Sequence, residues 1–421
     1  MPAITITEGT TWAIAAVATG GVIARPWRLP EAIWAVLGAA SLVVFALVPW
    51  REALNAVGRG TDVYLFLAGM MLLAELARQQ GLFDWLAAMA VKRARGSADR
   101  LFALVFGVGT AVTIFLSNDA TAVVLTPAVY AAAKAAKAQP LPYLFVCAFI
   151  ANAASFALPI SNPANLVVFG RHMPSLPSWL AQFALPSVLS IGATYIVLRL
   201  TQLASLRQAI AKDVNVPPLP RAGRLTAYGI GAAAVILLTA STADIRLGWP
   251  TFLASALTVC VVSIDQRRPP WDVLRHISWS VLPLVAGLFV MVEALARTGV
   301  IEQLSRVLQA DAQSSTAATS WVAGAIVAVA SNLMNNLPVG LIAGSAVTTA
   351  SLPPQITGAL LIGIDLGPNM SVTGSLATIL WLVALRRDGQ EVSTWQFLRL
   401  GVVVTSPALL LALTGFVVVQ M

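Results

Sequence analysis

The chain has 421 residues, of which 58% are hydrophobic and only 10% are charged, and its mean hydropathy is +0.81. Soluble domains are about 25% charged, so this composition excludes a soluble globular protein and predicts a polytopic membrane protein in a lipid bilayer. The net charge is +8. The basic residues occupy short loops between apolar runs, which is typical of an orientation signal, so we expect no nucleic acid as a partner.

Ten full spans and two re-entrant hairpins are predicted, because about 20 apolar residues are needed to cross a bilayer. In the first half the spans lie near residues 11–25, 30–50, 62–79, 141–172 (broken at 161–165) and 176–200, and the hairpin arms near 101–116 and 121–138. In the second half the spans lie near residues 224–243, 246–264, 278–298, 355–386 (broken at 368–375) and 395–420, and the hairpin arms near 320–334 and 337–350. The segment 80–100 is predicted to be a helix at the cytoplasmic surface.

A glycine–glutamate–glycine pattern occurs once in each half of the chain. Gly69, Glu75 and Gly81 recur at the same spacings as Gly287, Glu293 and Gly299. Five full spans per half is an odd number, so the second half begins on the opposite side of the membrane and the repeats are inverted. We therefore predict an all-α protein with a first membrane repeat over residues 1–200, a cytoplasmic linker over 201–223 and a second, inverted membrane repeat over 224–421.

The orientation follows from the positive charges. With the N-terminus outside, most of the 26 lysine and arginine residues fall on the cytoplasmic side, as the positive-inside rule requires. We therefore expect both termini outside and the chain in the cytoplasmic (inner) membrane. Glu8 precedes the first apolar run, where a signal peptide would carry basic residues, which argues against a cleaved leader.

Polar residues interrupt the apolar segments at the two hairpin tips and the two broken spans. Irregular backbone at membrane depth must be buried in protein or face a water-filled cavity, because each unsatisfied backbone group costs several kcal/mol. Ordinary helix capping or an intrahelical bond is the alternative for each residue alone, but the duplication favours a common site. The predicted substrate-binding residues are Ser117, Asn118, Asn162, Asn165, Asn335, Asn336, Thr373 and Ser375.

Two acidic residues at these breaks are predicted to take part in proton coupling. A carboxylate at membrane depth is costly to ionise and is a functional candidate by default. For Asp119 the alternatives are proton binding, which we favour, cation ligation and helix capping. For Asp365 a proton or counter-charge role competes with a structural role at a helix end. Glu75 is expected to pair with Arg78 at helix-neighbour spacing.

Cofactor chemistry and ATP hydrolysis find no support in the sequence. Cys147 and Cys260 lie far apart inside apolar runs, so neither a disulfide framework nor a metal cluster is expected. The chain contains no Gly-Lys dipeptide, and a P-loop requires one. We therefore expect a transporter and not an enzyme, without a cofactor or metal.

Three motifs resemble the arsenite permease (ArsB) family of the ion transporter superfamily. Residues 117–127 (SNDATAVVLTP) are similar to its N-D-[GA]-x-x-x-x-L-T-P segment, and residues 331–338 (SNLMNNLP) to its S-x-x-M-N-N-[ML]-P segment. Residues 365–382 (DLGPNMSVTGSLATILWL) are similar to its D-L-G-P-x-x-[ST]-x-x-G-S-L-A-T-x-L-W segment. The resemblance covers essentially the whole chain and both repeats.

This resemblance implies efflux of arsenite or antimonite as neutral trihydroxides, such as As(OH)3, in exchange for protons. A neutral polyhydroxylated ligand suits Asn, Ser and Thr, which offer donors and acceptors together. Some members of the family act with a separate ArsA-type ATPase, and the sequence does not decide whether this chain does.

Other functions remain open at this point. The sodium/dicarboxylate relatives carry paired S-N-T motifs, whereas this chain has S-N-D and S-N-P-A-N, which disfavours a sodium-coupled dicarboxylate or anion transporter. A sodium/proton antiporter of the same superfamily and a passive channel for neutral metalloids are further alternatives.

Overall fold

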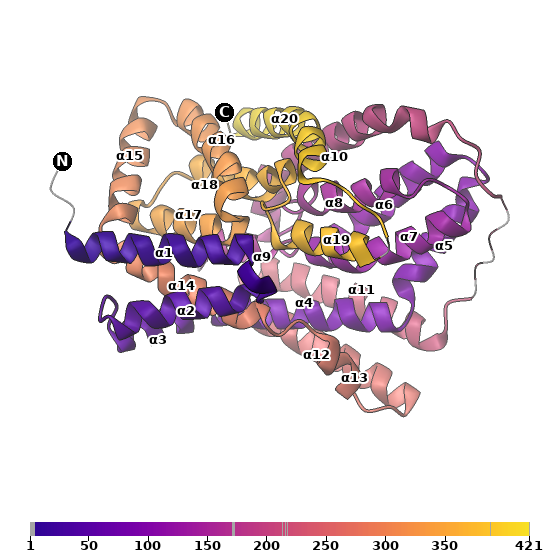
Figure 1. Ribbon diagram of the computed structural model, residues 1–421, viewed down its shortest axis with the longest axis horizontal. Coiled ribbons are helices and arrows are strands. Elements are labelled where there is room, and N and C mark those ends of the chain that lie inside the picture. Colours follow the sequence, from indigo (N-terminus) through magenta and orange to yellow (C-terminus); the bar gives the residue numbers. More distant parts are fainter. Residues whose placement is uncertain are drawn as a thin grey trace.

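The computed structural model describes residues 5–170, 173–212, 214, 216, 218–387 and 389–420. In these residues the chain is helical and has no strand beyond an isolated bridge between Ser97 and Ala209 (Figure 1). The last two residues of the predicted span 141–172, and positions 213, 215 and 217 of the predicted linker, lie outside the described residues. The predicted all-α class is confirmed.

The two halves contain helices in matching order. The first half consists of α1 (Ile6–Ala24), η1 (Pro26–Arg28), α2 (Glu31–Val44), α3 (Trp50–Arg59), α4 (Thr61–Gln79), α5 (Leu82–Ala94), α6 (Ala98–Phe115), η2 (Ala120–Leu125), α7 (Thr126–Ala135), α8 (Leu141–Ala153), α9 (Pro163–Phe169) and α10 (Leu176–Leu206). The second half consists of α11 (Arg221–Thr242), α12 (Gly248–Gln266), α13 (Trp271–His276), α14 (Val281–Arg297), α15 (Val300–Ser314), α16 (Thr316–Met334), α17 (Asn336–Ala350), α18 (Pro354–Leu366), η3 (Gly367–Met370), α19 (Leu376–Arg387) and α20 (Thr394–Val419).

Helices of the two halves pack in reciprocal pairs. α4 packs on α12, and its counterpart α14 packs on α2. α6 packs on α8 just as α16 packs on α18, while α10 and α20 pack against each other. The hairpin helices α6 and α7 lie toward one end of the long axis and α16 and α17 toward the other (Figure 1). This is the arrangement of two inverted repeats, although the division at residues 200 and 224 stays a prediction and α10 itself continues to Leu206.

The described residues contain six helices long and apolar enough to cross a membrane: α6, α10, α11, α12, α16 and α20. Two bent pairs, α3–α4 with a bend of 48° and α14–α15 with a bend of 73°, raise the number to eight. Of the remaining predicted spans, 11–25 corresponds to the 19-residue α1, while 30–50, 141–172 and 355–386 consist of shorter helices, namely α2 and the broken pairs α8–α9 and α18–α19. Sequence analysis missed α3 and α15 as separate helices, because their polar faces do not resemble a span.

The duplicated glycines have a structural explanation. Gly81 and Gly299 have φ angles of 70° and 77° and end α4 and α14 in the left-handed conformation that glycine tolerates best. A Cβ on Gly69 would lie 2.8 Å from the Thr251 carbonyl oxygen on α12. A Cβ on Gly287 would lie 2.6 Å from the Ala35 carbonyl oxygen on α2. The repeated pattern therefore encodes the two reciprocal helix contacts.

Candidate functional site

Each hairpin tip is bonded through its backbone to the broken span of the same half. The Asn118 amide donates to the Ser161 carbonyl at 3.1 Å, and the Asn336 amide donates to the Gly374 carbonyl at 2.9 Å. The same bond thus occurs twice, once in each repeat. It satisfies backbone groups that have no helical partner at these depths and brings the predicted tip residues against the predicted break residues.

The first tip combines satisfied capping atoms with unpartnered polar atoms. The Ser117 hydroxyl accepts from the Ala120 amide at 3.1 Å, and Asn118 Oδ1 accepts from the Asp119 amide at 2.9 Å. Among the described residues, Asn118 Nδ2 and the Asp119 carboxylate have no hydrogen-bond or ion-pair partner. The π-helix η2 follows directly, and such segments occur often at functional sites. Capping therefore explains Ser117 but leaves Asp119 free to bind a ligand or a proton.

The second tip has neutral polar atoms in the corresponding place. Asn335 has a φ of 71° and caps α17 through Oδ1, which accepts from the Leu337 amide at 3.3 Å. Such backbone angles are rare outside glycine and cluster at functional sites. The Asn336 side-chain amide has no hydrogen-bond partner among the described residues, although the residue is only 4% exposed. Both tips therefore hold a free amide group.

The first break is organised by its two asparagines. Asn162 caps α9, since its Oδ1 accepts from the Ala164 amide at 3.0 Å, and its Nδ2 donates to Asp365 Oδ1 at 2.8 Å. Asn165 Nδ2 donates to the carbonyls of Ser155, Leu158 and Pro159 at 3.1, 3.1 and 3.3 Å. Asn165 thus holds the irregular backbone of the break together, and it is not among the residues that line the cavities described below.

The second break is held by hydroxyl groups and by an asparagine from the neighbouring hairpin. Thr373 donates to the Asn332 carbonyl at 2.9 Å, and Ser375 accepts from the Thr378 amide at 3.1 Å. Asn332 Nδ2 donates to the Gly367 carbonyl at 2.9 Å, while its Oδ1 accepts from the Ser371 hydroxyl at 2.8 Å. Sequence analysis did not single out Asn332, although it lies in the motif SNLMNNLP.

Two side-chain hydrogen bonds join the broken spans of opposite halves. One is the bond from Asn162 to Asp365, and the other runs from Asn152 Nδ2 to Asn369 Oδ1 at 2.9 Å. All four residues are at most 1% exposed. Sequence analysis missed Asn152 and Asn369. An asparagine at the end of an apolar helix was the available signal for Asn152, and its place in the motif DLGPNM was the signal for Asn369.

A cavity of about 600 Å³ reaches from the protein surface to both breaks. Its lining includes Ser117 and Asp119 from the first tip, and Pro163 and Leu376, the first residues of the two short helices that follow the breaks. The other predicted site residues surround these positions but do not line the cavity. The pseudo-symmetric hairpin arm, α17, packs against α9, whereas η2 packs against α19. This cavity is the candidate substrate site.

Most of the titratable side chains at the mouth of this cavity already have hydrogen-bond or ion-pair partners. Glu75 accepts from Arg78 Nε at 2.8 Å and from Gln79 Nε2 at 2.7 Å, so the predicted pairing of Glu75 with Arg78 is confirmed. The His276 ring contacts the Asp272 carbonyl at 2.6 Å. Arg387 is exposed and forms no ion pair within the described part of the chain. Asp119 is therefore the unpaired carboxylate of the cavity.

A second cavity of about 450 Å³ lies on the other side of the two tips. It is lined by α9 and α17 and by four charged residues, of which Arg59 pairs with Glu293 and Arg246 lies 3.7 Å from Asp62. Neither tip contributes to its lining. Of these two cavities, the first tip is thus reached only by the one that Asp119 lines.

Comparison with known proteins identifies the family of this fold and site. Residues 14–372 match the model of a family described as CitMHS, citrate transporter. The chain belongs to this family. It is 27% identical to the arsenical pump membrane protein of Escherichia coli K12, covering 94% of this chain and 95% of that protein. It is 27% identical to the arsenical pump membrane protein of Yersinia enterocolitica, covering 86% of each. It is 26% identical to a protein of Mycobacterium bovis named an uncharacterised transporter, covering 91% of this chain and 92% of that protein.

A solved structure has the same overall fold. The crystal structure of the YdaH transporter from Alcanivorax borkumensis, described as having an unusual topology, aligns with a TM-score of 0.52 over 86% of both chains at 16% sequence identity. The chain is therefore a multi-pass membrane transporter of the CitMHS and arsenical pump type, as the resemblance implied.

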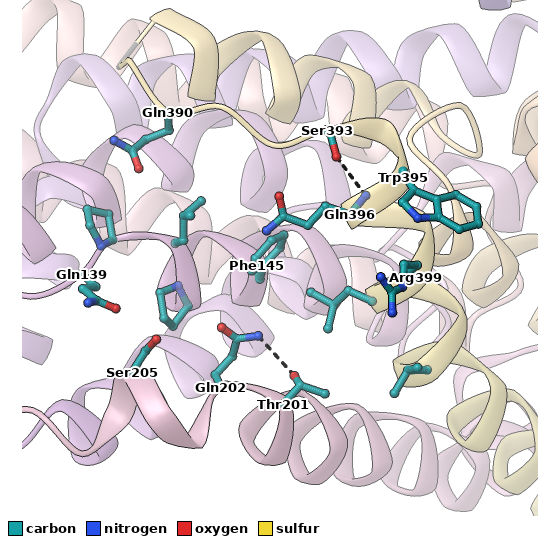
Figure 2. Close-up of a pocket in the computed structure, with 15 residues that line it drawn as sticks. Gln139, Phe145, Thr201, Gln202, Ser205, Gln390, Ser393, Trp395, Gln396 and Arg399 are labelled. Atoms are coloured by element: carbon teal, nitrogen blue, oxygen red, sulfur yellow. Dashed lines mark hydrogen bonds between the residues drawn. The ribbon is translucent and has the colours of Figure 1, made fainter.

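A further groove, of about 800 Å³, lies apart from the candidate site. It is enclosed by the start of α8, the end of α10 and the start of α20, and its polar lining includes Gln202, Gln396 and Arg399 (Figure 2). Gln202 donates to Thr201 and Ser393 accepts from the Gln396 amide (Figure 2). None of the predicted site residues lines this groove. The 800 Å³ groove is thus larger than the candidate site but contains none of the hairpin-tip residues.

Proposed function

We propose that this member of the CitMHS family is a secondary active exporter of arsenite and antimonite, carried as neutral trihydroxides in exchange for protons. The observation that carries the proposal is the unpaired Asp119 carboxylate beside the free amide of Asn118, in a cavity that reaches both broken spans. The relatives named arsenical pump membrane protein extend over nearly the whole chain, which supports the substrate.

The chemistry of the site fits a neutral trihydroxide. Its three hydroxyl groups donate and accept hydrogen bonds. An ionised Asp119 accepts one of them, and Ser117, the other tip residue that lines the cavity, offers its hydroxyl to another. Asn162, Asn335 and Ser375 support these groups through the break and tip backbones. Among the described residues no ion pair neutralises Asp119 at the tip, so a neutral ligand adds no charge beside the carboxylate.

Coupling follows if solute and proton compete for the Asp119 carboxylate. Protonation removes an acceptor that the solute uses, so each ligand weakens the binding of the other by the same factor, corresponding to roughly 1–3 kcal/mol. Asp365, buried and bonded to Asn162, is the second candidate for a proton or counter-charge role. The two hairpins and two broken spans would move together as the transport unit, because backbone and side-chain hydrogen bonds join them.

The direction of transport follows from the predicted orientation. The mouth of the candidate cavity contains Arg78 and Arg387, both exposed. The positive-inside rule assigns this side to the cytoplasm, with both termini outside, in the cytoplasmic (inner) membrane. The conformation described here is then the one that takes up the solute from the cytoplasm. A separate ArsA-type ATPase is not needed for this cycle, and the flux experiment below tests whether one is required.

Transport of an anion, such as a dicarboxylate or citrate, is the second candidate function. The family description names citrate, and Arg387 lines the cavity without an ion pair among the described residues. Against this reading, Arg78 is engaged by Glu75, and a polyanion at the tip would meet the like charge of Asp119. Like charges that are juxtaposed at a binding site cost several kcal/mol, so the site favours a neutral ligand.

Arsenite flux in proteoliposomes of the purified protein tests the function. A pH gradient is imposed, first with equal sodium on both sides and then with a sodium gradient. Uphill arsenite movement that follows the pH gradient and ignores the sodium gradient is expected. Movement only down the arsenite gradient would indicate a channel or a missing ATPase subunit. Citrate uptake without arsenite movement would establish the anion transporter instead.

A further inference from the structure

The ends of α8 and α18 meet in a buried polar cluster that contains Asp365, for which the proposed transport cycle left open a proton or counter-charge role. Asn152 is the penultimate residue of α8, Asp365 is the penultimate residue of α18, and both are 0% exposed. The C-terminal end of a helix carries partial negative charge. Two such ends and a carboxylate therefore concentrate negative potential at one buried position, where an anion would be repelled.

The orientations of the surrounding amides are fixed by their partners. Asn369 Nδ2 donates to the Phe149 carbonyl at 2.8 Å, so Asn369 Oδ1 must be the atom that accepts from Asn152 Nδ2. Asn165 Nδ2 donates to three backbone carbonyls. Neither Asn152 nor Asn165 can rotate its amide without losing these bonds. The Oδ1 atoms of both residues are consequently acceptors.

Three oxygen atoms in this cluster lack a hydrogen-bond donor. They are Asn152 Oδ1, Asn165 Oδ1 and Asp365 Oδ2. All three residues adjoin Ser155: its hydroxyl donates to the Asn152 carbonyl at 2.7 Å, its carbonyl accepts from Asn165 Nδ2 at 3.1 Å, and its hydroxyl lies beside the Asp365 carboxyl. A buried acceptor without a partner costs about 1–3 kcal/mol, so a positively charged or donating group is required here.

We propose that this cluster binds one dehydrated monovalent cation of the size of sodium, with Asp365, Asn152, Asn165 and Ser155 as its oxygen ligands. Carboxylate, amide and hydroxyl oxygens are the ligands that hard cations prefer. A single positive charge neutralises the single buried carboxylate, which is otherwise costly at membrane depth. A proton on Asp365 would supply one donor for three acceptors, whereas a cation satisfies all of them. A divalent ion would leave an uncompensated charge.

The ion is inferred to be resident and not exchanged in each transport cycle. None of its ligands lines any of the three cavities described above. Its ligands come from α8, the break after α8 and α9 of one half, and from α18 of the other, so it links the two broken spans. The inference concerns the transport unit and does not depend on the substrate, since binding and unfolding are measured without arsenite.

Binding is tested on the purified full chain in detergent at constant ionic strength. Sodium chloride replaces choline chloride, and the midpoint of thermal unfolding is recorded together with equilibrium binding of ²²Na⁺. We expect one saturable sodium per chain and a rise in the midpoint of about 5 °C. Potassium should have a smaller effect, because its larger radius does not suit a site formed for sodium.

Asp365→Asn should abolish ²²Na⁺ binding and the sodium response, and should be as stable without sodium as with it, because its amide supplies donors to the orphan oxygens. Ser155→Ala, a milder change, should weaken sodium binding by about tenfold. Asp119→Asn is the matched control and should retain sodium binding.

Equal midpoints of thermal unfolding in sodium and choline with no bound ²²Na⁺ would overturn the proposal, as would an Asp365→Asn variant that still binds sodium. Stabilisation by acid alone, equal in both salts, would assign a proton to Asp365 in place of the cation.

Discussion

Replacement of Asp119 by asparagine should uncouple solute movement from the proton gradient. The candidate cavity contains three titratable side chains besides its arginines, namely Glu75, Asp119 and His276. Glu75 is engaged by Arg78 and Gln79, and His276 is exposed at the mouth beside the Asp272 carbonyl. One group therefore remains to carry one proton for each solute. Asp119→Asn keeps the size of the side chain and one acceptor oxygen but cannot exchange a proton.

The size of the arsenite gradient that the protein can sustain follows from the exchange of one proton for each solute. One proton moving down one pH unit supplies about 1.4 kcal/mol at 25 °C, which sustains a tenfold gradient of solute. Because the solute is neutral, the exchange also moves one positive charge, and a membrane potential contributes about 2.3 kcal/mol per 100 mV. With the potential clamped at zero, the wild-type protein should hold about a tenfold arsenite gradient per pH unit, and Asp119→Asn should hold none.

The assay measures the steady-state distribution of arsenite in proteoliposomes at several imposed pH differences, with valinomycin and equal potassium to clamp the potential. The variant should still equilibrate arsenite down its own gradient, and that downhill flux is the control for folding. A wild-type slope near a hundredfold per pH unit would require a second proton and refute the count. A variant that still accumulates arsenite would refute the assignment of Asp119.

Three further predictions test the packing and the access of the site. Asn162→Ala removes the cap of α9 and the bond to Asp365, which together contribute about 2 kcal/mol to the free energy of unfolding. Denaturant unfolding of the detergent-purified protein should show this loss, and an unchanged unfolding midpoint would contradict these contacts. Gly374→Ala places a methyl group 2.5 Å from the neighbouring backbone of the second break and should cost about 1–3 kcal/mol in the same assay, whereas alanine at an open glycine is the control. On a background without exposed cysteine, Ser278→Cys should react with an impermeant maleimide added on the cytoplasmic side. Thr349→Cys should react when the maleimide is added outside, because the two residues line opposite cavities. Labelling of both variants from one side would disprove the orientation.

Much of the architecture could be predicted from local pattern. Long apolar runs predicted α6, α10, α11, α12, α16 and α20. The polar interruptions predicted both tips and both breaks, because an irregular backbone in a bilayer needs polar partners. The helices α3 and α15 were missed, since each is an amphipathic continuation beyond a bend of its neighbour and has no hydrophobic stretch of its own.

The roles within the site could be predicted only in part. Ser117 and Asp119 line the candidate cavity, whereas Asn165 is turned toward the carbonyl groups of its own break. An asparagine that binds a solute and one that satisfies backbone carbonyls have the same sequence appearance, since the same amide performs both tasks. The difference depends on which backbone groups the fold leaves without partners.

The sequence by itself determined the membrane class, the duplication and the positions of the four breaks, because hydropathy, glycine spacing and polar interruptions are properties of short segments. The tertiary structure alone decided which breaks meet. The bonds from Asn162 to Asp365 and from Asn152 to Asn369 join residues more than 200 positions apart, and no local signal specifies such a pairing. It also decided that the first tip lines the candidate cavity whereas the second tip does not, because access depends on how the hairpins pack against α4, α9 and α19 in space.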